Sequence, residues 1–467
     1  MPRRLIGGTF AVLLVLAVPS GAALQGSRAA WIDAYRAAAA TLIARAEEDD
    51  FAWNRLAELT DTFGPRLSGS KNLEQAIEWA VAQLRQDGFD NVRTEPVMVP
   101  HWVRGEERLT LLEPGARPLP MLGLGGSVGT PPGGVEADLL VVDSFEALER
   151  RAAEARGRIV LFDVPYVSYG ETVQYRVSGP SRAARAGAVA VLVRAVGPTG
   201  LRTPHTGALT YSSGAPAIPA ASISAEDSAM LARLQARGTR VRLRLEMGAS
   251  WLPDAPSANV IAELRGRERP DEVVVVGCHF DSWDVGTGAS DDAAGCIAAW
   301  ETLRLMKVTG LRPRRTVRLV LFANEENGLR GGAAYLEQYR HALQDHILMI
   351  ESDLGVFAPL TMGFSGPPAA RARIEDIARL LAPVGIHRIG PAGGGADIAP
   401  AAEAGAIPTL SIAGDMTRYF TIHHTHADTV DRIDPIEVSR AAAALAVVTY
   451  VAADMPVRLV EGTTSSR

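Results

Sequence analysis

The chain has 467 residues, of which 47% are hydrophobic and 21% are charged, and its formal net charge is −6. This length exceeds the usual single domain, so we expect two domains or one domain with a large insertion. The composition is that of an ordinary globular protein, and its acidic balance offers no basic surface for nucleic acid, so no nucleic-acid partner is expected.

The first residues have the pattern of a secretory signal peptide. A basic "MPRR" precedes an apolar run over 5–24, and small residues surround Ala23, after which we expect cleavage. The alternative is an uncleaved membrane anchor, because the run is nearly long enough to span a bilayer. Its glycines, its proline and its small-residue exit favour cleavage. We therefore expect a secreted or periplasmic protein without stable membrane insertion after cleavage.

Two helices, a strand and a loop are expected next. Residues 29–49 and 72–89 carry apolar side chains at helical spacing, and the second segment reaches Gly88, a residue suited to close a helix. Residues 92–99 alternate like a half-buried strand. The Gly/Pro-rich segment 113–134 indicates a linker or loop.

A compact α/β series occupies the middle of the chain. It is of domain size and contains no dense cluster of catalytic residue types. A Pro-rich joint at 250–259 closes it. We therefore predict an inserted domain at 116–250 between two parts of a larger domain, 24–115 and 251–467. The predicted strands of the insertion are 137–143, 158–163, 189–195 and 241–247, and its predicted helices are 145–157, 179–188 and 225–238.

The larger domain is predicted to be an α/β fold. Strands that are almost continuously apolar alternate with helices, which is typical of a mixed, mostly parallel central sheet with helices on both faces. The expected strands are 259–264, 272–277, 316–324 and 346–353, and the expected helices are 292–306 and 331–343.

Side chains that can bind metal follow the ends of these strands. In open α/β sheets, ligands collect outside the carboxyl ends of the strands. Each residue alone has an ordinary explanation as a helix cap, a turn residue or a surface histidine. Their convergence on one sheet edge predicts a site for divalent metal. The residues are His279, Asp281, Asp291, Asp292, Glu325, Glu326, Asp353, His423, His424, His426 and Asp428.

The chain has two cysteines, Cys278 and Cys296, which flank this region. They are too few for a disulfide framework, so we interpret them as buried small residues beside the site. Whether they pair is left open, because sequence cannot place them within bridging distance.

A pair of metal ions needs a divided set of ligands. Two zinc ions about 3.5–4 Å apart require a bridging carboxylate and a separate imidazole and carboxylate set for each ion. A further carboxylate must stay off the metals to take a proton from the bridging water. Of the adjacent Glu325 and Glu326, one can ligate and the other can serve as base. Asp281 suits a hydrogen bond to the second ring nitrogen of His279.

Four segments resemble the di-zinc exopeptidases, a family that includes bacterial leucyl aminopeptidases and glutamate carboxypeptidases. They are "HFDSWDVGTGASDDAAG" (279–295), "NEENGLRGG" (324–332), "ESD" (351–353) and "HHTHADT" (423–429). Supporting likeness at 64–77, 95–107, 393–400 and 415–429 extends the resemblance over nearly the whole mature chain.

The resemblance implies a role for each position. His279 and Asp353 would bind one zinc, Glu326 and His424 the other, and Asp291 would bridge the two. Glu325 would be the general base and acid. A cis peptide is expected after Asp291, and the insertion would be a protease-associated domain. His423 and His426 receive no zinc role. Candidate substrate contacts are Asp397, Arg330, Arg418 and Tyr419, although surface salt bridges explain the two arginines equally well.

The function that the resemblance implies is hydrolysis of dipeptides or short peptides with two zinc ions per chain. The resemblance also implies a homodimer. Cobalt or manganese would also suit these ligands. The alternatives are a leucyl-type aminopeptidase, a metal-free binding protein and an aminoacyltransferase of the glutaminyl-cyclase type. No ligand position is substituted, which argues against the binding protein, and the segment 281–295 argues against the transferase.

Overall fold

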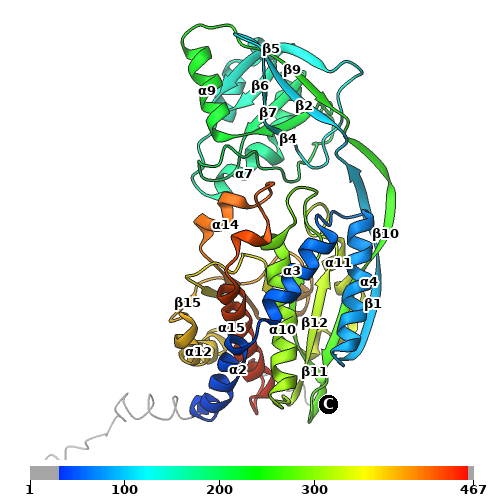
Figure 1. The fold of residues 1–467 in the computed structure, drawn as a ribbon, viewed down its shortest axis with the longest axis vertical. Helices are drawn as coiled ribbons and strands as arrows, with labels where there is room; N and C mark the ends of the chain where they lie inside the picture. The colour runs from blue at the N-terminus through cyan, green and yellow to red at the C-terminus, as the bar shows by residue number, and fades with distance from the viewer. Residues whose placement is uncertain (1–30, 461–467) are drawn as a thin grey trace, which may run out of the picture.

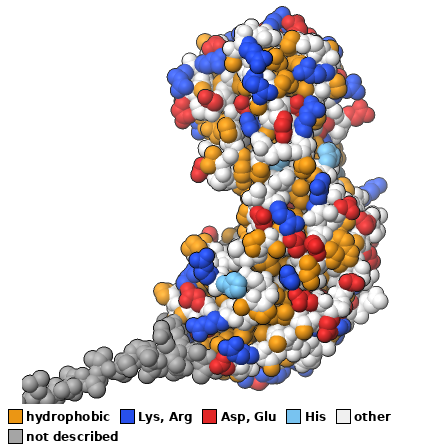
Figure 2. All heavy atoms as spheres, turned by 60° about the vertical axis from the view of Figure 1, so that its left-hand side comes forward, with side chains coloured by type: hydrophobic (Ala, Val, Ile, Leu, Met, Phe, Trp, Pro, Cys, Tyr) orange, Lys and Arg blue, Asp and Glu red, His pale blue; other side chains and the backbone are white. Residues whose placement is uncertain are grey.

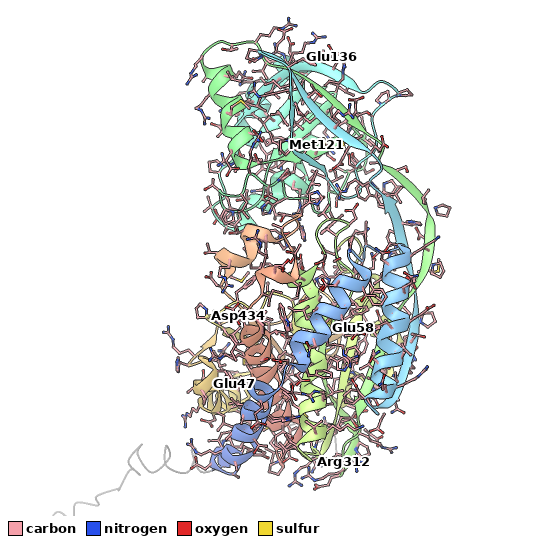
Figure 3. The ribbon with its side chains drawn as sticks, viewed as in Figure 1. Glu47, Glu58, Met121, Glu136, Arg312 and Asp434 are labelled. Atoms are coloured by element: carbon pink, nitrogen blue, oxygen red, sulfur yellow. A yellow bond between two sulfur atoms is a disulfide. The ribbon has the colours of Figure 1, made fainter. Side chains whose placement is uncertain are left out.

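The protein forms two lobes, each built on its own sheet (Figure 1). The computed structural model describes residues 31–460, so the predicted signal peptide lies outside the described residues. Figure 2 shows that the lobes meet at a narrower waist. Arg312 marks the far end of the first lobe and Glu136 the far end of the second (Figure 3).

The first lobe contains a sheet that has eight strands within the described residues. Its four central strands are parallel to one another, whereas antiparallel strands flank them. The predicted mixed α/β fold is therefore confirmed. The strands, in spatial order, are β1 (Asp90–Val103), β10 (Ser250–Leu264), β12 (Arg315–Phe322), β11 (Arg269–His279), β13 (His346–Ser352), β16 (Thr409–Ala413), β14 (Thr361–Ser365) and β15 (Ile389–Gly390).

Helices cover both faces of this sheet because alternate side chains of its central strands are apolar on both sides. In β11, Val274 and Val276 pack into the larger core, while Val273 and Val275 pack into the smaller core opposite. The larger core contains α2 (Arg36–Glu48), α3 (Phe51–Phe63), α4 (Lys71–Gln86), α10 (Ala294–Val308), α12 (Pro368–Ala378) and α15 (Pro435–Asp454), and the smaller core contains α11 (Arg330–Tyr339) and α13 (Ala399–Gly405).

Helix α15 is the central helix of the larger core, an element that the sequence patterns above did not predict. Among the described residues it alone is long and apolar enough to cross a membrane by length and composition, yet 89% of its most apolar window is buried. It packs against α10 and α2. Its apolar character therefore has a structural explanation inside the lobe.

The second lobe contains an α/β sheet that spans 107–247. Its β5, β6, β7 and β8 run parallel in sequence order, with antiparallel strands at the edges. The strands, in spatial order, are β3 (Arg117–Leu119), β2 (Glu107–Glu113), β9 (Arg242–Met247), β5 (Val135–Val142), β6 (Ile159–Phe162), β7 (Ala190–Arg194), β8 (Ala220–Ile223) and β4 (Met121–Gly123), and the helices are α5 (Phe145–Arg150), α6 (Ala152–Ala155), α7 (Tyr169–Val177), α8 (Gly179–Arg185) and α9 (Ala225–Ala236).

Two Pro-rich segments differ from the loops that their composition predicts. Segment 113–134 contains β3 and β4, and 250–259 is the outer half of β10. Within residues 31–460 that half pairs with β1 alone, so its prolines break no ladder on the other edge. The predicted domain limits stay predictions, although the second sheet already includes β2, before residue 116.

Candidate active site

The parallel strands of the first lobe bring the predicted site residues to one edge. His279 ends β11, Glu325 and Glu326 follow β12, and Asp353 follows β13. The register places Phe322 of β12 beside His279, so the two strands end level with each other. Neighbouring parallel strands thus deliver residues that are far apart in sequence to one place.

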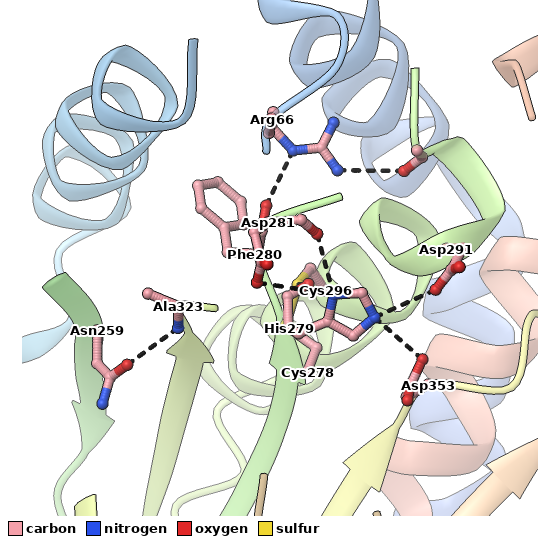
Figure 4. The surroundings of a disulfide bond; sticks show 11 residues. Arg66, Asn259, Cys278, His279, Phe280, Asp281, Asp291, Cys296, Ala323 and Asp353 are labelled. Atoms are coloured by element: carbon pink, nitrogen blue, oxygen red, sulfur yellow. Dashed lines mark hydrogen bonds and ion pairs between the residues drawn. A yellow bond between two sulfur atoms is a disulfide. The ribbon is translucent and has the colours of Figure 1, made fainter. Parts of the chain in front are cut away.

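His279 lies between two carboxylates (Figure 4). Its Nε2 atom is 3.2 Å from Oδ1 of Asp291 and 3.2 Å from Oδ1 of Asp353. Its Nδ1 atom is 2.9 Å from the backbone carbonyl oxygen of Asp281, which fixes the proton on Nδ1. The unprotonated Nε2 then faces only acceptors, so a cation or a second proton must lie between them.

A second imidazole faces the other oxygen of Asp291. Nε2 of His424 is 3.1 Å from Oδ2 of Asp291 and 3.0 Å from Oε2 of Glu326. His423 stacks on His424 with ring centroids 3.5 Å apart, and its Nε2 is 3.4 Å from the same Oδ2 atom. Asp291 therefore presents one carboxylate oxygen to each side of the site.

The backbone around Asp291 is held in an unusual conformation. The Asp291–Asp292 peptide is cis, as expected. The Asp428 carboxylate accepts hydrogen bonds from the backbone N–H groups of Ser290 at 2.7 Å and Asp291 at 3.1 Å. Asp428 is therefore a positioning residue for the segment that carries Asp291.

Asp281 contacts His279 through a different atom from the one we predicted. Its carboxylate Oδ1 is 3.9 Å from Nδ1 of His279, because the backbone carbonyl of Asp281 takes that position. The carboxylate instead accepts the N–H groups of Glu325 at 3.0 Å and Glu326 at 3.4 Å, and the hydroxyl of Ser68 at 3.2 Å. It thus fixes the turn that presents both glutamates.

The acidic groups of the site are strongly perturbed. Burial raises the pKa of Glu325 well above its ordinary value, and Asp353 and Glu326 raise it further against the opposing effect of His279. Burial raises the pKa of Glu326 to about 7, against the lowering effect of His424. Burial disfavours the charged form of His279, but Asp353 and Asp291 outweigh it and raise its pKa. Burial therefore disfavours the charged forms of Glu325 and Glu326, and a bound cation would favour them.

The donor atoms fit divalent metal ions. Ligand atoms of His279, Asp291 and Glu326 all lie within 4.8 Å of one another, as do those of Asp291, His423 and His424. Oε1 of Glu326 is buried without a hydrogen-bond partner among the described residues. Imidazole nitrogen and carboxylate oxygen are the ligands that zinc takes in catalytic sites.

Cys278 and Cys296 form a disulfide, with their Cα atoms 5.0 Å apart, which answers the question that the sequence left open (Figure 4). The bond joins β11, at the residue before His279, to α10. Neither sulfur is therefore available as a thiolate ligand.

A cavity of about 490 Å³ lies between the lobes over these groups. Glu325, Asp353 and His424 line it from the first lobe, and Tyr169 and Arg176 line it from the second. This volume is in the range of small-molecule sites. The sequence patterns did not predict Tyr169 or Arg176, since no motif marks either residue.

The remaining sequence candidates separate by their surroundings. Tyr419, on α14 (Met416–Ile422), lines the cavity. Arg418 is engaged elsewhere, because its Nη1 is 2.6 Å from Oε1 of Glu437. The other candidates are not part of the cavity lining: Arg330 and His426 are exposed, and Asp292 and Asp397 are buried.

Comparison with known proteins extends the sequence resemblance. The sequence profile of Peptidase family M28 matches residues 259–449. Carboxypeptidase Q of Mus musculus is 47% identical over 404 residues, which are 86% of each protein. The structure of a peptidase M28 precursor from Shewanella amazonensis has a TM-score of 0.88 at 34% identity, covering 92% of this chain and 98% of that chain. A zinc aminopeptidase from Bacillus subtilis shares the fold, with a TM-score of 0.65 at 20% identity over 86% of this chain and 95% of that chain.

Proposed function

This chain belongs to peptidase family M28 and is a metallopeptidase, and we propose that it is a secreted or periplasmic exopeptidase that hydrolyses dipeptides or short peptides with two zinc ions. The placement of Asp291 carries the proposal. Its Oδ1 is 3.2 Å from His279 and its Oδ2 is 3.1 Å from His424, so one carboxylate serves two histidines. A shared carboxylate is what two metal ions about 3.5–4 Å apart require.

The other ligands follow from the same geometry. His279 and Asp353 would hold one ion, and Glu326 and His424 would hold the other. His424 is preferred to His423 because its Nε2 also lies 3.0 Å from Glu326, whereas His423 reaches only the Oδ2 atom of Asp291, at 3.4 Å. Bound there, the ions would supply Lewis acidity that polarises a peptide carbonyl and lowers the pKa of a bound water toward about 7.

Glu325 has the position of a general base. It lines the cavity beside the ligands, and the proposal gives it no metal to bind. Its carboxylate accepts a proton from the attacking water and returns that proton to the leaving amine. Asp281 holds the backbone N–H of Glu325 at 3.0 Å, which keeps this carboxylate in place.

The second lobe, predicted at 116–250, is proposed to be a protease-associated domain that completes the substrate site. The backbone N–H of Thr206 donates to the carbonyl oxygen of His424 at 2.9 Å, and Tyr169 stacks on Phe420. These contacts support a lobe that shapes the cavity from above the first lobe's strand ends.

The disulfide supports export to an oxidising compartment. Paired structural cysteines persist in secreted and periplasmic proteins and are rare in the cytosol. The predicted leader lies outside the described residues, and a homodimer stays a prediction.

The test is metal content combined with a panel of end-blocked dipeptides. We would purify the chain from Leu24, measure its metals by elemental analysis, and assay free, N-blocked and C-amidated dipeptides. We expect two zinc ions per chain and turnover of free dipeptides. Equal turnover of C-amidated substrates, with loss of activity on N-blocked ones, would instead indicate a leucyl-type aminopeptidase. A protein that binds no metal and stays inert after zinc is added would overturn the proposal in favour of a binding protein.

A further inference from the structure

The segment that follows His279 reaches into the core of the second lobe. Trp283 and Val285 are buried in a cluster formed mainly by side chains of the second sheet. A Cβ atom on Gly125 of the second lobe would come within 1.9 Å of the Trp283 ring, so the glycine leaves the space that this ring occupies. The first lobe is therefore anchored in the second a short distance along the chain from a proposed metal ligand.

An ion pair lies beside this anchor. Arg104, between β1 and β2, donates through Nε to the carboxylate of Asp284 at 2.8 Å. Its Nη2 atom donates to Oγ1 of Thr206 at 3.2 Å, and that hydroxyl donates to the carbonyl oxygen of Gly123 at 2.7 Å. The side chains of Arg104 and Asp284 are 10% and 24% exposed, so most of the pair is shielded from water. We call Arg104, Thr206, Trp283 and Asp284 the lobe junction.

The lobe junction contacts one proposed metal ligand, His424. The backbone N–H of Thr206 donates to the carbonyl oxygen of His424 at 2.9 Å, and the rings of Trp283 and His424 meet edge to face with centroids 5.7 Å apart. His424 has φ +59°, in the left-handed region that residues with a side chain rarely adopt. Such a conformation persists only where its surroundings hold it. The second lobe supplies part of what holds it here.

The other proposed metal position is built within the first lobe. His279 ends β11, and its Nδ1 atom lies 2.9 Å from the backbone carbonyl oxygen of Asp281. Asp353 follows β13 of the same sheet, and its Oδ1 atom lies 3.2 Å from Nε2 of His279. These contacts come from the first lobe, whereas His424 is also held from the second.

We propose that the lobe junction positions His424, so that packing of the second lobe on the first completes one of the two metal positions; this inference rests on the proposed function. The four junction residues are positioning residues, because they act through His424. Groups that orient a metal ligand contribute about 10- to 100-fold to metal affinity. The ion at Glu326 and His424 therefore depends on the second lobe, whereas the ion at His279 and Asp353 does not.

The experiment first isolates each metal position. Asp353→Asn weakens the position that Asp353 shares with His279, so the ion beside Glu326 and His424 can be measured by itself. Glu326→Gln weakens that second position, so the ion beside His279 and Asp353 can be measured instead. The zinc affinity of each protein is determined by competition with a chelator, a measurement that needs no turnover.

The junction ion pair is then removed in both proteins by the double change Arg104→Gln and Asp284→Asn. In the Asp353→Asn protein we expect the zinc affinity to fall about 10- to 100-fold. In the Glu326→Gln protein we expect a change of less than about threefold, because the junction does not contact that position. Asp284→Asn alone should give a smaller loss with the same selectivity, since Arg104 keeps Glu107 at 3.6 Å.

The matched control is a second ion pair of similar burial, Arg194 and Asp163. Their charged atoms lie 2.9 Å apart, and their side chains are 12% and 18% exposed. Both lie in the second lobe, and neither lines the cavity. Arg194→Gln combined with Asp163→Asn should leave the zinc affinity unchanged in both proteins. Circular dichroism checks the folding of every variant.

A second measurement needs no change to a metal ligand. Calorimetric titration of the metal-free protein with zinc should show two binding steps. The double junction variant should weaken one of these steps and leave the other unchanged.

The outcomes separate this inference from the proposed function. Equal losses in the Asp353→Asn and Glu326→Gln proteins would overturn the inference, because the junction would then act on the fold as a whole. Unchanged affinity in both would also overturn it and would show that the turn at 423–429 holds His424 without the second lobe. A chain with an intact junction that binds no zinc would overturn the proposed function and this inference with it, whereas two bound ions and an unaffected junction variant would overturn this inference alone.

Discussion

Two regions of the molecule place charged side chains in opposite surroundings, the far end of the second lobe and the strand ends of the first. At the far end of the second lobe, Glu136 lies exposed between Arg242 and Arg244, at 3.0 and 2.8 Å (Figure 3). At the strand ends of the first lobe, Asp291 and Glu326 are buried and face imidazoles. Exposed pairs contribute little to stability, whereas a buried acidic cluster is costly and marks a functional site.

The two ends of β13 show a related contrast between a buried residue with neutral partners and a partly buried residue that faces a titratable group. His346 begins β13 and is buried, but its Nε2 is 2.8 Å from the hydroxyl of Tyr335 and its Nδ1 is 3.0 Å from the carbonyl of Ala342. Asp353, just past the other end, faces His279. Burial of a titratable group is therefore no sign of function when neutral partners satisfy it.

Replacing the proposed base should give the largest effect. Glu325→Gln should lower kcat about 10²- to 10⁴-fold, because the amide cannot accept the proton, while the metal content stays unchanged. Steady-state kinetics and elemental analysis check this. Glu337→Gln is the control, since Glu337 is exposed on α11 and pairs with the exposed Arg340. Loss of metal in Glu325→Gln would contradict the assignment of this residue as base.

Removing the carboxylate of Asp281, which holds the turn that carries Glu325 and Glu326, should have a smaller effect. Asp281→Asn places an amide N–H₂ opposite one of the N–H groups of Glu325 and Glu326. We expect a loss of about 10- to 100-fold in activity or metal affinity, as is typical of groups that orient ligands. Competition with a chelator measures the affinity. An unchanged affinity together with full activity would show that Asp281 is dispensable.

His346, whose two ring nitrogens both have neutral partners, should make the stability of the protein depend on pH. Burial lowers the pKa of His346 from 6.5 to about 4. Between these values the unfolded chain takes up a proton that the folded protein refuses, so the free energy of unfolding falls as the pH drops from 6.5 toward 4, by at most about 1.4 kcal/mol per pH unit. In His346→Gln this dependence should be shallower. Urea denaturation of metal-free protein at several pH values tests it, and equal slopes would contradict it.

The exposed pairs of the second lobe should give the smallest effect. Glu136→Gln removes a carboxylate that pairs with both Arg242 and Arg244, but water solvates all three side chains. We expect no measurable change in Tm or in activity. A clear drop in Tm would break the contrast between the two regions, because it would show that exposed charges also stabilise the protein.

The sequence by itself determined the central strands β11, β12 and β13 and the edge at which the site lies. Apolar runs such as 272–277 bury themselves on both faces, and the polar residues that follow them must emerge where parallel strands end. His279, Glu325 and Asp353 could be grouped in this way from the sequence alone. Their chemical roles stay predictions.

Tertiary structure alone decided which atoms meet. The carbonyl of Asp281, not its carboxylate, contacts His279, and Cys278 pairs with Cys296. Residues 250–259 form a strand because β1 pairs with one of its edges. The prolines are tolerated because β12 does not pair with the other edge of this segment. Sequence periodicity reports only which side of an element is buried, so it could not predict these contacts.

Arg176 shows the limit most clearly. It meets His424 across 248 positions of sequence, from a different lobe, and no local pattern accompanies it. Nearby residues determine whether a segment becomes a helix, but only the packing of one lobe on the other determines what that helix faces. The edge of the sheet that carries the candidate metal ligands could therefore be predicted from the sequence. The second-lobe residues that line the cavity could not.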